Sequence, residues 1–126
     1  MLASRRRTAE RLELAGEVRI ADTAIRSLYV DLLFLGVHGM DPEAGYTTPN
    51  LAEAETNRTL VANARRVVVL ADSSKWRTIG LCRIAPLRAA DVVVTDDELP
   101  LDARRVLGDA TELIIVPVPS ETEEAG

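Results

Sequence analysis

Four short runs of aliphatic residues dominate the pattern of hydrophobic and polar positions along the chain. They lie at residues 32–37, 67–70, 92–94 and 113–116, and none of them alternates apolar with polar positions. Continuous aliphatic runs bounded by turn residues are typical of strands that are buried on both faces, as in a parallel sheet. Branching at Cβ restricts χ1 in a way that extended backbone accommodates, so the valines and isoleucines also favour strands. The pattern therefore predicts four strands of one parallel sheet.

The segments between these runs carry signals for helices. Asn50 is a good N-cap and Glu53 stands three residues later, so the pair approximates a capping box ahead of an amphipathic helix over residues 51–64. Asp97 is suited to cap a further helix, which we expect to end at Gly108. Each of these helices follows one predicted strand and precedes the next. Such an arrangement predicts right-handed connections between parallel strands.

A shorter helix is predicted over residues 22–28, ahead of the first strand. The alternation of helices and strands predicts an α/β fold, a three-layer α/β/α sandwich with a mostly parallel sheet. We expect residues 1–119 to form this single domain. The remaining residues, 120–126, have the polar sequence SETEEAG and are expected to be disordered.

Length and charge narrow the class of protein. The 126 residues are enough for one domain with its own core. The chain has 15 Lys and Arg against 20 Asp and Glu, a net charge of -5, and residues 91–126 carry two Arg and ten acidic residues. Because neutralising phosphates requires clustered cations, an acidic chain of this kind is a poor nucleic-acid binder on its own.

The chain has one cysteine, Cys82, and one histidine, His38. These counts exclude an intrachain disulfide, a multi-cysteine zinc site and a paired-histidine metal motif, so we expect no metal and no cofactor. No apolar run approaches the roughly 20 residues of a membrane span. The first residues lack the apolar region of a secretory signal. We therefore expect a cytoplasmic protein without a membrane partner.

Polar residues follow three of the predicted strands, at residues 38–41, 72–75 and 95–97. Ligands of open α/β sheets bind beyond the carboxyl ends of the strands. Lys75 is the only lysine among the 15 cations, and its ammonium is a compact point charge suited to a phosphate or a small anion. Two interpretations remain open from the residues alone. Asp72 orients Lys75 or binds a sugar hydroxyl, or else Asp72 caps a short helix and Lys75 is merely exposed.

Three motifs carry a resemblance to a known family. They are F-L-G-x-x-G-x-D from Phe34 to Asp41, G-x-T-T-P-N-x-x-E from Gly45 to Glu53, and D-S-S-K from Asp72 to Lys75. Together they resemble the carboxyl-terminal half of the effector-binding domain of DeoR-type transcriptional repressors, over residues 17–119. The resemblance implies the fold of ribose-5-phosphate isomerase, glucosamine-6-phosphate deaminase and coenzyme A transferases, truncated at its amino-terminal half. In such regulators this domain senses a phosphorylated sugar or related metabolite and releases an attached helix-turn-helix domain from its operator.

The resemblance also implies roles for individual residues. Asp41 is expected near sugar hydroxyls, and Glu53 at the rim of the effector pocket. Asp72 and Lys75 are expected to line that pocket, with Lys75 facing the anion. His38 stands where many relatives carry Asp, and a neutral imidazole does not replace a carboxylate base without changing the pH dependence. The expected effector-binding residues are His38, Gly39, Asp41, Glu53, Asp72 and Lys75, and none of them is expected to be catalytic.

Two departures from the family pattern shape the expected function. No helix-turn-helix is recognisable, so DNA would be contacted only through a domain absent from this chain. No Gly-rich loop is present that would cradle a phosphate at a helix N-terminus. The prediction is a non-enzymatic, sugar-phosphate-responsive effector-binding domain of a repressor.

Two alternatives to this prediction stay open. One is a non-catalytic interaction or oligomerisation remnant, in which Asp72, His38 and Lys75 have only structural roles. The less favoured one is a sugar-phosphate isomerase or deaminase with Asp41, Asp72 or His38 as its base.

The resemblance has a consequence for assembly. The family's strand order places the Phe34 strand beside the missing half, which leaves the edge of this strand unpaired. A long aliphatic edge strand is a template for association. We therefore expect a homo-oligomer that covers this edge, or an N-terminal segment that folds back over it.

Overall fold

The structure is a computed structural model that describes residues 29–118. The helix predicted over residues 22–28 and the disorder predicted for residues 120–126 lie outside this range. None of the helices within it is long and apolar enough to cross a membrane. The elements in chain order are β1 (Val30–Gly36), β2 (Gly39–Asp41), β3 (Gly45–Thr48), α3 (Leu51–Asn63), β4 (Ala64–Leu70), the 3-10 helix η1 (Ser73–Lys75), β5 (Cys82–Ala85), the 3-10 helix η2 (Leu87–Ala89), β6 (Val92–Asp96), α4 (Leu101–Ala110) and β7 (Glu112–Val116).

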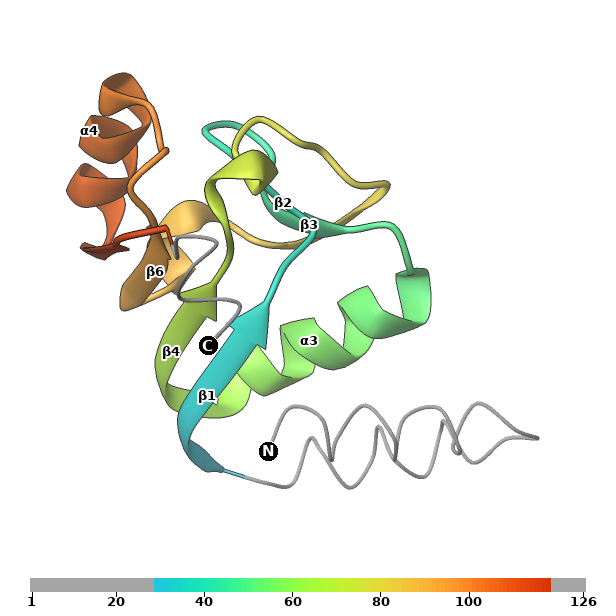
Figure 1. The fold of residues 1–126 in the computed structure, drawn as a ribbon. Helices are drawn as coiled ribbons and strands as arrows, with labels where there is room; N and C mark the ends of the chain where they lie inside the picture. Colours follow the sequence, from blue (N-terminus) through green and yellow to red (C-terminus); the bar gives the residue numbers. More distant parts are fainter. Residues whose placement is uncertain (1–28, 119–126) are drawn as a thin grey trace, which may run out of the picture.

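Two sheets organise these elements (Figure 1). The larger sheet has the order β1-β4-β6-β7, and all of its strand pairs are parallel. Its strands contain the four aliphatic runs, so the predicted α/β fold with a mostly parallel sheet is confirmed. The strand β1, which carries Phe34, lies at one edge of the sheet. The smaller sheet, β2-β3-β5, is antiparallel and is not anticipated by the hydrophobic pattern, because its strands have only three or four residues.

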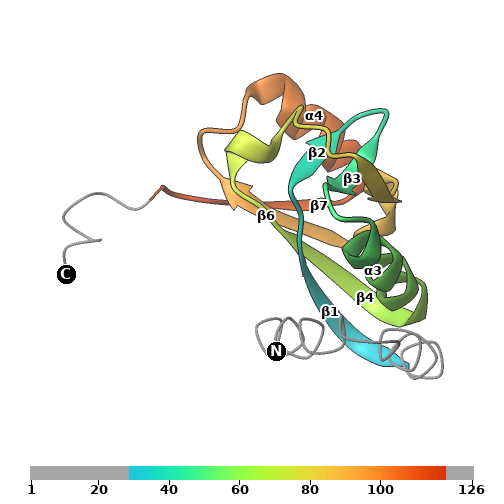
Figure 2. The same cartoon turned by 90° about the vertical axis from the view of Figure 1, so that its right-hand side faces the viewer.

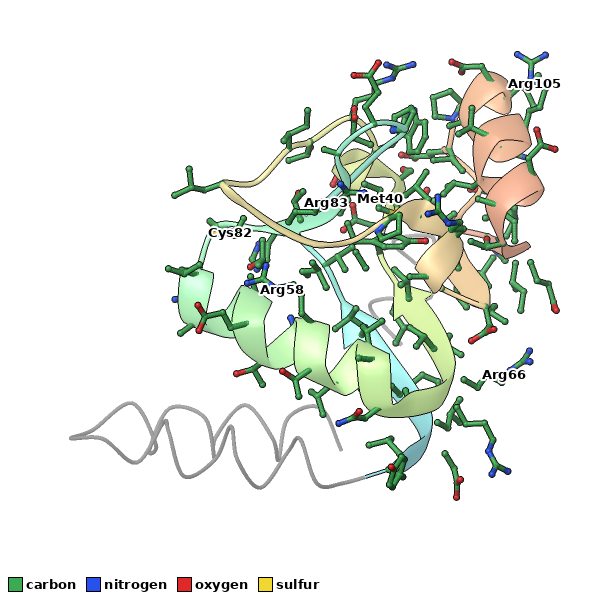
Figure 3. All side chains as sticks on the ribbon, turned by 180° about the vertical axis from the view of Figure 1, so that it is seen from behind. Met40, Arg58, Arg66, Cys82, Arg83 and Arg105 are labelled. Atoms are coloured by element: carbon green, nitrogen blue, oxygen red, sulfur yellow. The ribbon has the colours of Figure 1, made fainter. Side chains whose placement is uncertain are left out.

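The helix α3 begins where the sequence predicts. The side chain of Asn50 accepts a hydrogen bond from the backbone N–H of Glu53 at 2.9 Å, which satisfies one of the otherwise unpaired N–H groups of the first turn. The helix ends at Asn63, and β4 starts with the next residue. On the outer surface, the guanidinium of Arg58 donates to the backbone carbonyl of Arg83, which ties α3 to β5 (Figure 3).

The start and the end predicted for α4 are both wrong. Pro100, not Asp97, occupies the N-cap position, and it makes no side-chain capping bond. The backbone carbonyl of Asp97 instead accepts from the guanidinium of Arg104 at 2.7 Å. The helix also continues past Gly108 to Ala110. A glycine inside a helix costs about 1 kcal/mol relative to alanine, which a helix that buries Ala103 and Leu107 tolerates.

The two faces of the larger sheet differ. Leu33, Val69 and Val93 point to one face and are fully buried in the core cluster that also contains Leu60 of α3 and Leu107 of α4. Figure 2 shows α3 on this side of the sheet. On the other face, Leu32, Phe34, Leu70 and Ile114 are 37–40% exposed, whereas Val68 and Val92 of the two central strands are buried. Among residues 29–118, the expectation that the strands are buried on both faces therefore holds only for the central part of β4 and β6, because both α-helices pack on the Leu33 side.

Candidate functional site

The carboxyl ends of β4 and β6 are joined by hydrogen bonds from backbone to acidic side chains. Asp72, two residues after β4, is the N-cap of η1, and its Oδ1 accepts from the N–H of Ser74 at 2.9 Å and also from the Ser74 hydroxyl. Asp96, the last residue of β6, accepts from the N–H of Ser73 at 2.8 Å and from the N–H of Glu98 at 3.0 Å. The capping interpretation of Asp72 is confirmed, and two strand ends form one hydrogen-bonded unit.

These bonds control the ionisation of Asp96. The hydrogen bond from the backbone of Ser73 has the largest effect and lowers the pKa of Asp96, while desolvation opposes this shift. From the sequence, Asp96 reads only as a charge near a helix N-terminus. Asp96 stands two residues after the aliphatic run that ends at Val94, just as Asp72 stands two residues after the run that ends at Leu70, and this shared spacing is the signal that marks it as part of this unit.

The carboxylate of Asp41 closes a turn at the end of β2. Its Oδ2 accepts from the N–H groups of Glu43 at 2.9 Å and of Ala44 at 3.0 Å. The bond from Ala44 is the largest cause of the lowered pKa of Asp41, and the positive charge of Arg77 lowers it further. The residue is only 8% exposed. Asp41 therefore has a structural role in leading the chain into Gly45, whose φ of 75° lies in the left-handed region.

The segment after η1 is attached to the small sheet at β2. Met40 and Trp76 form a parallel bridge, and the N–H of Arg77 donates to the carbonyl of Met40 at 2.7 Å. Figure 3 places Met40 in the interior, and its side chain is fully buried. Arg77 has a φ of 67°, and its guanidinium lies 5.8 Å from the centre of the Trp76 ring. Sequence reasoning did not single out Arg77, because its strained backbone is set by this attachment.

The family model described as the DeoR C terminal sensor domain matches residues 10–97. The chain belongs to the DeoR C-terminal sensor domain family. The resemblance of this chain to the effector-binding domain of DeoR-type regulators is thereby confirmed.

Several curated relatives carry the names of transcriptional regulators. The putative aga operon transcriptional repressor of Escherichia coli O157:H7 is 35% identical over 97 residues, which are 76% of this chain and 36% of the relative. The HTH-type transcriptional regulator GlpR of Haloferax volcanii is 35% identical over 95 residues, 75% of this chain and 37% of the relative. The glycerol-3-phosphate regulon repressor of Escherichia coli K12 is 27% identical over 85 residues, 68% of this chain and 34% of the relative. The chain thus spans about a third of the length of these relatives.

In this sensor domain, close packing explains why position 39 is a glycine. A Cβ at this position would lie 2.0 Å from the carbonyl oxygen of Thr78 and 2.6 Å from the Oγ1 of Thr47. Only glycine allows β2 to approach the segment after η1 this closely. The neighbouring His38 is exposed, and its backbone N–H donates to the carbonyl of Thr47 at 3.1 Å. His38 and Gly39 therefore connect the end of β1 to the small sheet, in which Asp41 ends β2.

Lys75 is the last residue of η1, and it is half-buried. Its backbone N–H donates to the carbonyl of Asp72 at 3.1 Å. Within residues 29–118, its side chain makes no hydrogen bond and no ion pair. The sensor domain therefore holds the backbone of its single lysine firmly and leaves the ammonium without a partner in this range.

Glu53 is not brought together with the other predicted residues. It lies in the first turn of α3, and no hydrogen bond or ion pair in the described part of the chain joins it to Asp72 or Lys75. Figure 1 shows the start of α3 well away from η1. No group of three or more His, Cys, Asp and Glu that could hold a metal ion occurs among residues 29–118.

Proposed function

We propose that this chain binds a phosphorylated sugar or a related phosphorylated metabolite at the carboxyl edge of the parallel sheet, as the sensor part of a transcriptional repressor. The observation that carries the proposal is that hydrogen bonds join the ends of three strands, β4, β6 and β2. Hydrogen bonds from Ser73 to Asp96 and from Arg77 to Met40 hold the ends of β6 and β2 against the turn that carries Lys75. The names of the curated relatives, which include a glycerol-3-phosphate regulon repressor, support this class of ligand.

Lys75 is the residue that we assign to the anion. Its ammonium has no anionic partner within residues 29–118, so contact with a phosphate would not require an existing ion pair to break. A flexible lysine side chain brings a compact charge to a phosphate without fixing its orientation. The carboxylates of Asp72 and Asp96 are acceptors, and acceptors of this kind suit the hydroxyl groups of a sugar. The phosphate and the hydroxyl groups of a sugar phosphate would thus each find a complementary group at the carboxyl edge of the sheet.

Ligand binding without catalysis fits these groups better than an isomerase or deaminase reaction. A general base works best when its pKa lies near the working pH. The hydrogen bonds to Asp41 move its pKa in the opposite direction, below its ordinary value, and those to Asp96 do the same. The Oδ1 of Asp72 already accepts the capping hydrogen bonds of Ser74, so this oxygen is not available as a base. These features support a sensor, and a sensor would act in the cytoplasm, where phosphorylated metabolites and operator DNA are found. DNA binding would need a further domain, as in the relative named an HTH-type regulator.

Thermal unfolding in the presence of ligands tests this proposal. Glycerol 3-phosphate, fructose 6-phosphate and ribose 5-phosphate are each compared with the matching unphosphorylated compound at millimolar concentration. A ligand present at about 100 times its Kd adds about 2.7 kcal/mol of apparent stability. We expect a phosphate-dependent shift for at least one ligand.

Two variants assign the shift to the site. Lys75→Ala is expected to abolish it. Arg105→Ala, which removes an exposed cation from the outer side of α4 (Figure 3), is expected to keep it. A shift that survives in Lys75→Ala would contradict the assigned site. A wild-type chain that responds to none of the phosphates would favour the alternative of an interaction module without a ligand.

A further inference from the structure

Residues 75–78 form a tight turn that carries an arginine where glycine is favoured. The N–H of Thr78 donates to the carbonyl of Lys75 at 3.2 Å and closes the turn. Trp76 has a φ of -65° and a ψ of 131°, and Arg77 follows with a φ of 67°. These are the angles of a type II turn, whose third residue has a positive φ and is most often glycine. Among residues 29–118, Arg77 is the only residue other than glycine with a positive φ. Its side chain therefore stands at a position where a Cβ has a conformational cost.

The contacts of the Arg77 guanidinium leave its hydrogen-bond donors free. It lies over the Trp76 ring, 5.8 Å from the ring centre. A cation–π contact of this kind uses the charge of the guanidinium and none of its five N–H donors. Within residues 29–118, the guanidinium makes no hydrogen bond and no ion pair. Arg77 is exposed, so these donors are open to a ligand.

The turn also places Arg77 close to the residue assigned to the phosphate. Lys75 and Arg77 are separated by one residue, so their Cα atoms lie within about 7 Å of each other. The carboxylate of Asp41 is near enough for the positive charge of Arg77 to lower its pKa. The Oδ2 of Asp41 already accepts two backbone N–H bonds, and no ion pair joins this carboxylate to Arg77 in the described part of the chain. Two cations of different chemistry are thus available at one turn.

We propose that Arg77 determines the specificity of the effector site by binding a second anionic group of a metabolite whose phosphate is bound by Lys75. This inference rests on the phosphate site proposed above. A guanidinium presents paired donors that match two oxygens of a carboxylate or a phosphate, whereas an ammonium is a point charge. The favoured ligand class is therefore a phosphorylated sugar acid or a sugar bisphosphate, rather than a neutral sugar with one phosphate.

The acidic groups around the turn make this preference depend on Arg77. Asp72 caps η1 ahead of Lys75, and Asp96 accepts from the backbone of η1. Together with Asp41, these carboxylates outnumber the single ammonium of Lys75. Negative charge added to a ligand is repelled by them unless a second cation faces it. Arg77 supplies that cation, and without it a second anionic group would bring no gain in affinity.

Isothermal titration of the full chain with two matched pairs of ligands tests the proposal. Glycerol 3-phosphate is compared with 3-phosphoglycerate, which has a carboxylate in place of one hydroxymethyl group. Fructose 6-phosphate is compared with fructose 1,6-bisphosphate, which has a second phosphate. The wild-type chain is expected to bind the doubly anionic member of at least one pair about three- to tenfold more tightly. The pair that shows the preference identifies the second group as a carboxylate or a phosphate.

Two variants of Arg77 assign the preference to this residue. Arg77→Gly removes the cation and suits a φ of 67°, and it is expected to reduce the preference to less than twofold. Arg77→Lys keeps a positive charge without the paired donors, so an intermediate preference is expected. Arg105→Ala removes an exposed cation on α4 and is the control, which keeps the preference of the wild type. Circular dichroism establishes that each variant is folded.

The outcomes separate this proposal from the phosphate site on which it rests. A wild-type chain that binds both members of each pair equally overturns the role of Arg77 and leaves phosphate binding by Lys75 intact. A preference that persists in folded Arg77→Gly also overturns that role, since another group would then bind the second anion. An equal loss of affinity for both members would do so as well, because Arg77 would not discriminate between them. A wild-type chain that binds none of the four compounds overturns both proposals.

Discussion

The two faces of the parallel sheet are built from alternate residues of the same strands, yet they differ in burial. On β1, Leu33 is fully buried, whereas its neighbour Leu32 is 39% exposed. The difference comes from the connections between the strands. Both crossover helices, α3 and α4, contribute to the core on the Leu33 side, as right-handed connections that advance in one direction along a sheet require. The aliphatic character of a strand therefore does not tell which of its faces is covered.

The largest expected effect tests this difference directly. Leu33→Ala removes a fully buried side chain and leaves a cavity, and it is expected to lower the free energy of unfolding by about 2–5 kcal/mol. Leu32→Ala removes the same atoms from the opposite face of the sheet and is expected to cost less than about 1 kcal/mol. Urea unfolding of both variants at low protein concentration measures the difference. Equal losses would show that the two faces are equally covered in solution.

A second prediction concerns the small sheet, which packs on the Leu33 side of the larger sheet. Tyr46 is 1% exposed, and its hydroxyl donates to the carbonyl of Leu87 at 2.9 Å. Tyr46→Phe leaves that buried carbonyl without this partner and is expected to cost about 1–2 kcal/mol. Burial also raises the pKa of Tyr46 above its ordinary value of 10.0. Above pH 10 the unfolded chain therefore loses this proton while the folded chain retains it, and stability falls as pH rises.

Unfolding by urea between pH 8 and pH 11 checks the tyrosine prediction. The wild type should lose stability more steeply than Tyr46→Phe over this range. Tyr29→Phe serves as the control, because Tyr29 is 92% exposed. Parallel pH profiles of the wild type and Tyr46→Phe would argue that this hydroxyl is solvated rather than buried.

A third prediction addresses Asp96, the last residue of β6, in the candidate site. Asp96→Asn removes a charge that accepts two backbone hydrogen bonds, and it is expected to cost about 1 kcal/mol at neutral pH. Because the pKa of Asp96 is lowered on folding, its contribution is present above about 3.8 and is lost as pH falls below that value. The variant should therefore lose less stability than the wild type between pH 5 and pH 3. Asp97→Asn, one residue later, is the control and should follow the wild type.

The smallest effect is expected at the exposed end of the site. Arg77 adopts a φ of 67°, which costs a residue with a Cβ about 1 kcal/mol. Arg77→Gly relieves this strain, whereas Arg77→Ala keeps it, and both variants lose the contact with the Trp76 ring. Arg77→Gly is therefore expected to be more stable than Arg77→Ala by about 0.5–1 kcal/mol. Thermal unfolding distinguishes the two, and the reverse order would contradict a left-handed Arg77.

The candidate site could be predicted in part. The positions of Asp72 and Lys75 follow from the rule that strand ends of a parallel sheet meet at one edge, and both lie just beyond the end of β4. Asp41 instead ends β2 of the small antiparallel sheet, which the hydrophobic pattern does not predict. Glu53, which entered only through the family resemblance, lies apart on α3. Arg77 and Asp96 were missed as site residues because their places depend on hydrogen bonds to Met40 and Ser73, which are far from them in the sequence.

The sequence by itself determined the features that depend on near neighbours. The aliphatic runs specify the four parallel strands, and Asn50 with Glu53 specifies the start of α3. These signals act over a few residues, through side-chain burial and capping. The boundary of α4 shows their limit, since Asp97 and Gly108 are ordinary helix signals that α4 does not follow.

Only the tertiary structure decided the features that join distant segments. The small sheet depends on contacts such as the bond from the N–H of Gly80 to the hydroxyl of Thr47, residues that are 33 positions apart. The requirement for Gly39 arises from the carbonyl of Thr78, and the difference between the two sheet faces arises from where α3 and α4 pack. In each case the deciding quantity is the distance between groups that folding brings together, and no local pattern records it.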